Sequence, residues 1–337
     1  MNIILTCAGR RNYLVEYFRQ AIAGDGRVIV TDSSADAPTM QEADAAFVVP
    51  PVADPGYIPF LLNLCERERA GMLISLNDLE LPVLAASRER FLARGVVPVV
   101  SSPEVVDLCF DKWKTVLFLR SIGLSAPITV LSLESAREAL ARGELSFPLV
   151  VKPRWGTASI GIEFPEDETE LELAYALLKR RLMRTFLADV SATDPDRCIL
   201  IQERLRGQEY GLDIVNDLRG RPAAVFVKKK LAMRAGETDR AVTEEQPAIA
   251  KEGHVIGTRL GHVGNLDCDV FLTPNGPRVL ELNPRFGGGY PFSHVAGANL
   301  PAALIAWAQN REPTRAWLSV RAGVCAAKCD RLVVRID

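Results

Sequence analysis

The chain has 337 residues, of which 48% are hydrophobic, and 40 Lys and Arg stand against 42 Asp and Glu. This composition excludes a disordered protein, and the length corresponds to at least about two domains. A formal net charge of -2 leaves no excess of basic residues to bind a phosphate backbone. We therefore expect no nucleic-acid partner.

The apolar runs are too short for a membrane span, and the cysteines are scattered. The longest runs, 96–100 and 147–151, fall far below the roughly 20 residues that a bilayer requires, and Arg10 and Arg11 interrupt the amino terminus before any signal-type stretch. Only Cys325 and Cys329 are close together, without the second pair that a zinc site needs. We expect a soluble, cytoplasmic protein with reduced thiols and no membrane partner.

The first hundred residues alternate between strand-like and helix-like patterns. Short apolar runs occur at 2–7, 27–31, 46–49, 72–75 and 96–100, with amphipathic stretches at 12–23, 57–70 and 79–94 between them. Because βαβ connections cross over right-handed and join parallel strands, this alternation predicts an open, mostly parallel sheet covered by helices.

Polar residues follow two strands of this sheet, at the edge where open α/β sheets bind ligands. Gly9-Arg10-Arg11 could meet an anion, or could form a tight turn with solvated arginines. Asn77, Asp78 and Glu80 are explained equally well by helix capping and by ligand binding. Asp32 stands where a ribose-binding acid is expected, but without a complete GxGxxG the sequence gives little support to a dinucleotide-dependent oxidoreductase.

A second region begins after Ser101-Ser102-Pro103, which interrupts the periodicity and restarts a helix at Glu104. We expect this helix, which carries Asp111, Lys112 and Lys114, to run to about Ser121.

Strands predicted at 148–152 and 160–164 flank a glycine-containing loop. Lys152 ends the first strand as a point charge, and Gly156 and Ser159 free the backbone to cover phosphate oxygens. This chemistry suits a polyphosphate, although an ordinary hairpin with an exposed lysine has the same pattern. No GxxxxGK[ST] motif occurs, so a nucleotide site here belongs to another architecture.

A polar link lies between the strand-like segments 198–201 and 210–215. Backbone groups of the link 202–209 can supply the hydrogen-bond pattern that an adenine edge requires, and Glu209 can accept from ribose hydroxyls. A solvated link with locally paired Glu and Arg residues is the alternative.

The carboxyl-terminal part carries the most specific group of residues. Segments 266–272 and 279–283 form a predicted β-hairpin around Asn275-Gly276. A side-chain period of two places Glu281 and Asn283 on one face, and Asp267 and Asp269 together across the turn. Hard oxygen donors placed like this suit Mg²⁺. The following Arg285 can clamp a phosphoryl group, and the glycines at 287–289 let the backbone approach a ligand.

These motifs, in this order, resemble the ATP-grasp superfamily, in particular its branch related to the carbamoyl phosphate synthetase large subunit and to amino-acid ligases. The segments that carry the resemblance are Asp111-Lys112, Lys152 with its loop, 202–209, 234–238, Asp269 and 281–285. The resemblance covers most of the chain. It implies an α/β protein with the ATP-grasp fold: an N-terminal Rossmann-like pre-ATP-grasp domain at 1–103, a linker helix and central lid subdomain at 104–200, and a C-terminal α+β catalytic subdomain at 201–337.

The resemblance also implies roles for single residues. The implied ATP contacts are Lys112, Lys152, Gly156 and Ser159 for the phosphates, Gln202, Glu203 and Leu205 for adenine, and Glu209 for ribose. The implied magnesium ligands are Asp269, Glu281 and Asn283. Arg285 would hold the transferring phosphoryl group and Arg234 would reach the nucleotide phosphates. Of 228–230, whose alternation prevents all three lysines from facing the cleft, we choose Lys228.

The implied enzyme is an ATP-dependent carboxylate–amine ligase that forms an amide or peptide bond through an acylphosphate, with release of ADP and phosphate. Its partners would be ATP, Mg²⁺, for which Mn²⁺ can substitute, amino-acid-like carboxylate and amine substrates, and by base rate a second copy of the chain. The loop around Trp155 would exclude water as a lid. The alternatives are a non-catalytic or regulatory ATP-binding protein and a phosphorylating enzyme similar to carbamoyl phosphate synthetase.

Two further positions bear on the substrate and on proton transfer. Asp267 stands where D-alanine:D-alanine ligases have an arginine, which argues against that substrate class. His294, shortly after the glycines, is expected to be a hydrogen-bonded structural residue rather than the acceptor of an amine proton.

Overall fold

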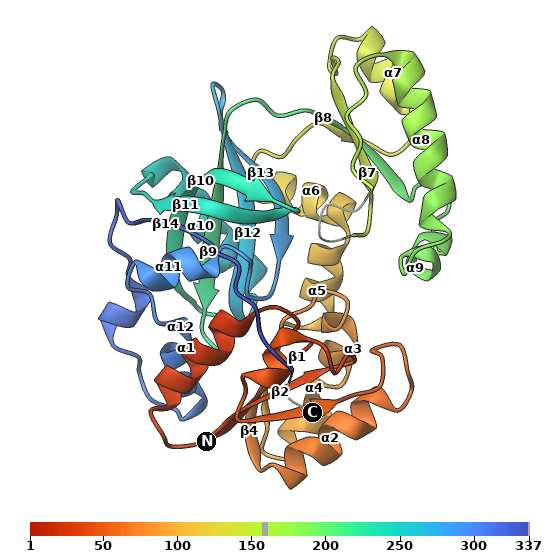
Figure 1. Ribbon diagram of the computed structural model, residues 1–337. Helices are drawn as coiled ribbons and strands as arrows, with labels where there is room; N and C mark the ends of the chain where they lie inside the picture. Colours follow the sequence, from red (N-terminus) through yellow and green to blue (C-terminus); the bar gives the residue numbers. More distant parts are fainter. Residues whose placement is uncertain (157–160, 336–337) are drawn as a thin grey trace.

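The computed structural model describes residues 1–156 and 161–335, which form three sheets (Figure 1). A parallel sheet lies at the bottom of Figure 1, a large antiparallel sheet lies above it, and a small sheet with the long helix α8 stands to the upper right. Among these residues no helix has the length and apolar character needed to cross a bilayer.

The N-terminal sheet has five parallel strands in the order β3-β2-β1-β4-β5, which confirms the prediction. The strands are β1 (Asn2–Thr6), β2 (Val28–Asp32), β3 (Ala45–Val48), β4 (Ala70–Ser75) and β5 (Val97–Val99). The three central strands are nearly continuous in Val, Ile and Leu because both of their faces are covered.

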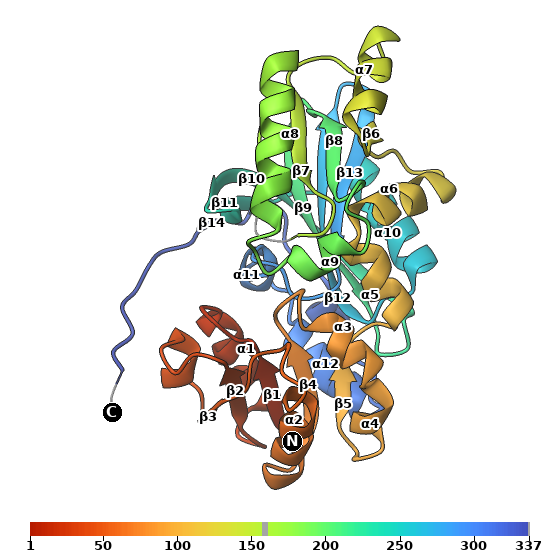
Figure 2. The same ribbon diagram turned by 90° about the vertical axis from the view of Figure 1, so that its right-hand side faces the viewer.

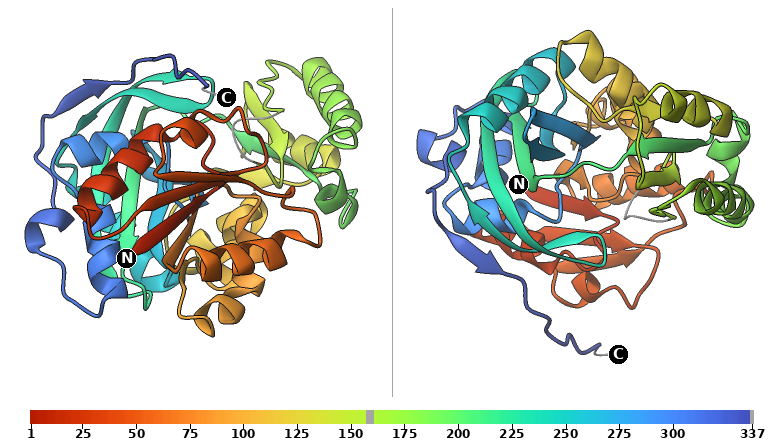
Figure 3. Two further views of the ribbon diagram at one scale, coloured as in Figure 1. Left: turned by 60° about the horizontal axis from the view of Figure 1, so that its bottom comes forward. Right: turned by 90° about the horizontal axis from the view of Figure 1, so that it is seen from above.

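Helices cover this sheet on both faces, as Figure 3 shows. One face packs on α1 (Asn12–Ile22) and on α12 (Leu300–Ala308), which comes from the far end of the chain. The other face packs on α2 (Tyr57–Arg67), α3 (Leu81–Ala86), α4 (Arg88–Leu92) and α5 (Pro103–Phe110). A 3-10 turn, η1 (Pro38–Gln41), precedes β3.

Two predicted helices are each divided in two. The helix predicted at 79–94 breaks at Ser87, whose backbone angles of φ -104 and ψ 4 leave the helical region. The helix predicted from 104 to 121 breaks at Asp111, which is extended and begins α6 (Lys112–Ser121) as its N-cap. The carboxylate of Asp111 accepts from the amides of Trp113 and Lys114, and this capping outweighs helix continuity.

The small sheet, in the order β6-β8-β7, forms the lid subdomain together with three helices. Its strands are β6 (Thr129–Val130), β7 (Leu149–Pro153) and β8 (Ile199–Glu203), and its helices are α7 (Leu133–Ala141), α8 (Glu168–Leu182) and α9 (Ala188–Ala192). Trp155 is buried in the apolar core of this unit. The strand predicted at 160–164 begins outside the described residues, and its remainder makes a single bridge, between Glu163 and Val151.

The large sheet is antiparallel, in the order β13-β12-β9-β10-β11-β14. Its strands are β9 (Gln208–Asn216), β10 (Pro222–Arg234), β11 (Glu237–Thr243), β12 (Gly264–Thr273), β13 (Gly276–Asn283) and β14 (Cys325–Ala327). The predicted hairpin is confirmed as β12–β13, with its turn at 274–275. Helix α10 (Pro247–Leu260) covers one face, and α11 (Tyr290–Val295) contacts β10 and β11.

Apolar packing joins the large sheet to the N-terminal sheet. Val215 and Phe226 of the large sheet, with Phe286 and Tyr290, belong to the same core as α1 and α12. A 3-10 turn, η2 (Arg315–Leu318), then leads to β14, and the chain after β14 runs back beside the N-terminal sheet (Figure 2). There Arg331 pairs with Glu42.

Candidate functional site

The predicted metal-binding carboxylates lie opposite each other on the β12–β13 hairpin. Asp269 is paired in register with Glu281, and the Asn283 amide donates to Glu281 across 3.4 Å. Alternation along β12 turns Leu266, Cys268 and Val270 toward the apolar core under α10. The same alternation therefore turns the two carboxylates and the amide to the opposite, polar face of the sheet.

Lysines from two different elements lie beside this hairpin. The Nζ of Lys230, in β10, lies 2.7 Å from Asp269 of β12 and 2.7 Å from Glu209 of β9. Lys230 therefore bridges these two strands. It reaches over Gly211 of β9, where a Cβ would come within 3.4 Å of the lysine chain. Lys112 at the start of α6 lies 3.5 Å from Glu281.

The lid positions Lys112. Arg154, at the end of β7, holds both oxygens of Asp111 in a buried bidentate pair of 2.9 and 2.7 Å. Lys112 itself donates from its backbone to Arg154 and from its Nζ to the Gly156 carbonyl at 2.7 Å. The start of α6 is thereby fixed to the strand end that carries Lys152.

Burial and like charges shift the pKa values in this cluster. Burial, and then the charge of Lys112, lower the pKa of Lys152 to about 8. Burial, together with the neighbouring Asp267 and Glu281 charges, raises the pKa of Asp269 against the opposing effect of Lys230. The pKa of Glu281 is lowered although burial acts to raise it, because Lys112, Lys152 and Lys230 stabilise its charge.

The residues present fit a hard divalent cation. The described residues contain no group of three His, Cys, Asp and Glu arranged as a metal cage. The donor set is instead two half-buried carboxylates and one amide, the oxygen-only and incomplete set that leaves room for phosphate and water on Mg²⁺. Burial is the main cause of the raised pKa of Asp269, and a cation bound beside the carboxylate would favour its anionic form.

Arg285 links this site to the N-terminal domain. Its guanidinium pairs with Asp267 of β12 at 2.9 Å and with Asp78, which follows β4, at 3.0 Å. All three side chains are largely buried. The sequence alone could not show this contact, because Asp78 and Arg285 are 207 residues apart.

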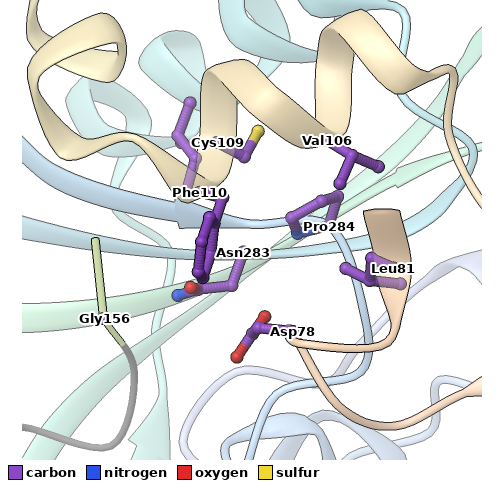
Figure 4. A pocket seen from close by; sticks show the side chains of 9 residues that line it. Asp78, Leu81, Val106, Cys109, Phe110, Gly156, Asn283 and Pro284 are labelled. Carbon is purple, nitrogen blue, oxygen red and sulfur yellow. The ribbon is translucent and has the colours of Figure 1, made fainter. Parts of the chain in front are cut away.

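Figure 4 shows a small cavity at this junction, lined by Asp78 from the N-terminal domain, Phe110 of α5, Gly156 from the lid loop and Asn283 of β13. Its volume is about 10 Å³, which corresponds to about one water molecule. The three parts of the protein therefore meet at the end of the carboxylate hairpin.

The structure brings together four of the eight predicted ATP contacts. Lys112, Lys152, Gly156 and Glu209 surround the hairpin carboxylates directly or through one neighbour. Glu203 accepts from the Ile128 amide at the start of the lid sheet. Leu205 is half-buried in the link between β8 and β9.

Three predicted residues make contacts with protein groups outside the carboxylate hairpin, and a fourth is not described. Gln202 is buried and donates to Thr129 inside the lid sheet. Arg234 is half-exposed and pairs with Asp239 and Asp330. Lys228 is buried in an ion pair with Asp213 and contacts Ser293. Ser159 lies outside the described residues.

Sequence reasoning missed Lys230, which takes the place that we had given to Lys228. Alternation puts both lysines on one face, and Lys230 alone of the two contacts a predicted metal ligand. The β9–β10 pairing, which runs to Lys229 opposite Tyr210, brings Lys230 next to Glu209.

His294 has the expected structural role. Its Nδ1 lies 3.1 Å from the Tyr290 hydroxyl, which also accepts from the Leu300 amide. The ring stacks on Tyr17 with 3.5 Å between centroids, and burial lowers its pKa to about 4.

Two family models match the chain in separate regions. Residues 3–100 match the PylC-like N-terminal domain, and residues 196–330 match an ATP-grasp family described as belonging to a biosynthetic pathway with the Ter operon. The large chain of carbamoyl phosphate synthase from Campylobacter jejuni is 25% identical over 257 residues, which are 73% of this chain and 22% of that protein. The chain thus spans about a fifth of the length of this relative.

Solved structures share the fold over nearly the whole chain. An L-amino acid ligase from Bacillus licheniformis matches with a TM-score of 0.69 and 20% identity over 95% of this chain and 77% of its own. The biotin carboxylase domain of 2-oxoglutarate carboxylase from Hydrogenobacter thermophilus, solved with MgADP, ADP and bicarbonate, matches with a TM-score of 0.71 and 15% identity over 92% of this chain and 70% of its own.

The fold class and the family resemblance predicted from the motifs are therefore confirmed. Members of this family are ADP-forming ligases. Residues 196–330 are thus similar to an ATP-grasp family, and residues 3–100 are similar to the PylC-like N-terminal domain.

Proposed function

We propose that the protein is an ATP-dependent carboxylate–amine ligase that works through an acylphosphate. The observation that carries the proposal is the half-buried group of Asp269, Glu281 and Asn283, surrounded by Lys112, Lys152 and Lys230. Such a group provides both oxygen ligands for a divalent cation and positive charge for a polyphosphate.

In this reaction an oxygen of the substrate carboxylate attacks the γ-phosphorus of ATP, and the bond to the β,γ-bridging oxygen breaks to release ADP. The amine nitrogen then attacks the acyl carbon. The C–N bond forms, the C–O bond to phosphate breaks, and the amine proton leaves to phosphate or solvent. No covalent enzyme intermediate is required, so catalysis rests on positioning and on charge stabilisation.

Each side chain has a part in that positioning. Lys112 and Lys152 would neutralise the ATP phosphates, and Arg285 would hold the transferred phosphoryl group. Asp269, Glu281 and Asn283 would hold Mg²⁺, which when bound supplies further positive charge to the phosphates. The Asp111–Arg154 pair keeps Lys112 beside the lid strand, so that closure of the lid and delivery of the charge are coupled.

Glu281→Gln tests the proposal. We expect turnover to fall by at least about 10²-fold, because a neutral amide weakens cation binding and removes the negative charge that Lys112, Lys152 and Lys230 stabilise. ADP and phosphate release would be measured over pairs of amino-acid-like carboxylates and amines, with mass spectrometry of the product. The thermal unfolding midpoint would show that the variant folds.

Glu138→Gln is the matched control, since Glu138 is exposed on α7 and pairs only with Arg142. It should turn over like the wild type. Normal turnover by Glu281→Gln would refute the assignment of the metal and phosphate site.

A further inference from the structure

A second polar group adjoins Arg285 and has no part in the phosphoryl chemistry above. Arg11, which follows β1, donates from Nη1 to the Phe286 carbonyl at 2.7 Å. Nη1 of Arg285 lies 3.4 Å from the same oxygen. The two guanidinium groups, one from each sheet, therefore lie side by side. Phe286 takes one of the five N–H donors of Arg11.

The hydroxyl of Tyr13, in the first turn of α1, lies in the same place. It is buried, and it has no hydrogen-bond partner among the residues that the structure describes. Arg11, Arg285 and Glu237 are close enough to act on it electrostatically, and burial raises the pKa of Tyr13 to about 12. The phenol is thus a protonated donor at neutral pH with no acceptor of its own. Buried hydroxyls without partners are rare and destabilising, so this one points to a ligand group.

The charges around the two arginines balance. Arg285 is neutralised by Asp78 and Asp267, and Glu237 is paired with Lys328 at 3.0 Å. Together with Arg11, the cluster has three cationic and three anionic side chains. The cations are Arg11, Arg285 and Lys328, and the anions are Asp78, Asp267 and Glu237. A dianion such as phosphate would face three carboxylates here, whereas a zwitterion matches the alternation of charge.

We propose that Arg11 and Tyr13 bind the carboxylate of the amine substrate, which makes that substrate an amino acid. This inference rests on the proposed ligase function. The carboxylate would accept from the Arg11 guanidinium and from the Tyr13 hydroxyl, and it would not react. The amino group would then lie toward Arg285, where the acylphosphate is held, and the amide product would keep the free carboxylate.

The three glycines at 287–289 fit this assignment, because the first two lie against charged side chains of the cluster. A Cβ at Gly287 would overlap the Asp267 carboxylate at 2.1 Å, and a Cβ at Gly288 would lie 3.0 Å from the Glu237 carboxylate. The backbone therefore runs directly over two of the charged groups of this cluster.

The test uses the twenty common L-amino acids, each paired with its carboxamide, as probes of the full-length protein in the presence of MgADP. We expect at least one amino acid to raise the thermal unfolding midpoint while its carboxamide does not. Tyr13→Phe should weaken that binding by about ten- to a hundred-fold, the effect of losing a hydrogen bond to a charged group. Without probe, Tyr13→Phe should unfold at the wild-type temperature or above it, since it removes an unpaired hydroxyl.

Tyr17→Phe is the matched control, one turn further along α1, and it should bind the amino acid as the wild type does. The proposal is overturned if no amino acid binds, if carboxamides bind equally well, if Tyr13→Phe binds normally, or if inorganic phosphate is the probe whose binding depends on Tyr13. ADP release separates this inference from the ligase function. If an amino acid binds in a Tyr13-dependent way but no carboxylate causes ADP release, the subsite is supported and the ligase function is refuted. If carboxamides are ligated as fast as amino acids, the ligase function is supported and the subsite is refuted.

Discussion

Replacing Gly287 by alanine should disturb the site without replacing any charged residue. A Cβ built at this position lies 2.1 Å from both Cγ and Oδ1 of Asp267, which is the partner of Arg285. The backbone angle φ of Gly287 is not in the left-handed region, so alanine is not strained there by its own backbone. The effect of the substitution is therefore steric.

The size of the effect follows from these distances. An ordinary contact needs about 3.4 Å, so the loop or the Asp267 carboxylate must move by about 1 Å. Forcing a methyl group into a packed site costs about 1–3 kcal/mol of stability. Because Asp267 holds Arg285, the guanidinium should move too, and a displacement of about 1 Å in a positioning group can lower turnover by about 10²-fold.

The measurement compares Gly287→Ala with Gly253→Ala. Gly253 lies in α10, where a Cβ would meet Val225 at 2.7 Å, on the side of the sheet away from the polar face. Both variants should lose stability in urea unfolding, and only Gly287→Ala should lose ADP release. If Gly287→Ala kept turnover within about twofold of the wild type, the coupling of Asp267 to Arg285 would have no catalytic importance.

Two further predictions concern the lysines of the cleft. Because burial lowers the pKa of Lys152 to about 8, the lysine is charged below this pH and neutral above it, so the KM for ATP should rise as pH increases through about 8. Lys152→Arg, which stays charged, should show no such rise, and an identical rise in both proteins would assign it to another group. Lys228→Met should destabilise the protein by about 3–5 kcal/mol in urea unfolding, since it leaves Asp213 buried without its ion pair. The double variant with Asp213→Asn should recover much of that loss, and a double variant as unstable as the single one would show that the pair itself is not responsible.

The elements whose signals are local could be predicted from the sequence. The alternating N-terminal sheet, the β12–β13 hairpin and the face shared by Asp269, Glu281 and Asn283 depend only on side-chain periods and on a turn. The break at Asp111 was not predicted, because the apolar period runs through it. Arg154, which pairs with Asp111 from 43 residues away, favours the extended cap.

The choice between Lys228 and Lys230 needed the tertiary structure. Period two gives both lysines the same face, and which of them meets a metal ligand depends on how β9 and β12 align with β10. Lys228 forms an ion pair with Asp213, whereas Lys230 extends across Gly211 and forms an ion pair with Asp269. Strand register between distant segments has no local signature, so the sequence leaves this choice open.

The sequence by itself therefore determines which chemical groups this protein brings to a phosphate site, because the motifs are contiguous and their periods are short. The tertiary structure decides what those groups face. Asp78 reaches Arg285, and Arg11 and Tyr13 come beside it, only when the N-terminal sheet packs on the large sheet. That packing is driven by apolar burial in a shared core, and the positions of the charged groups follow from it.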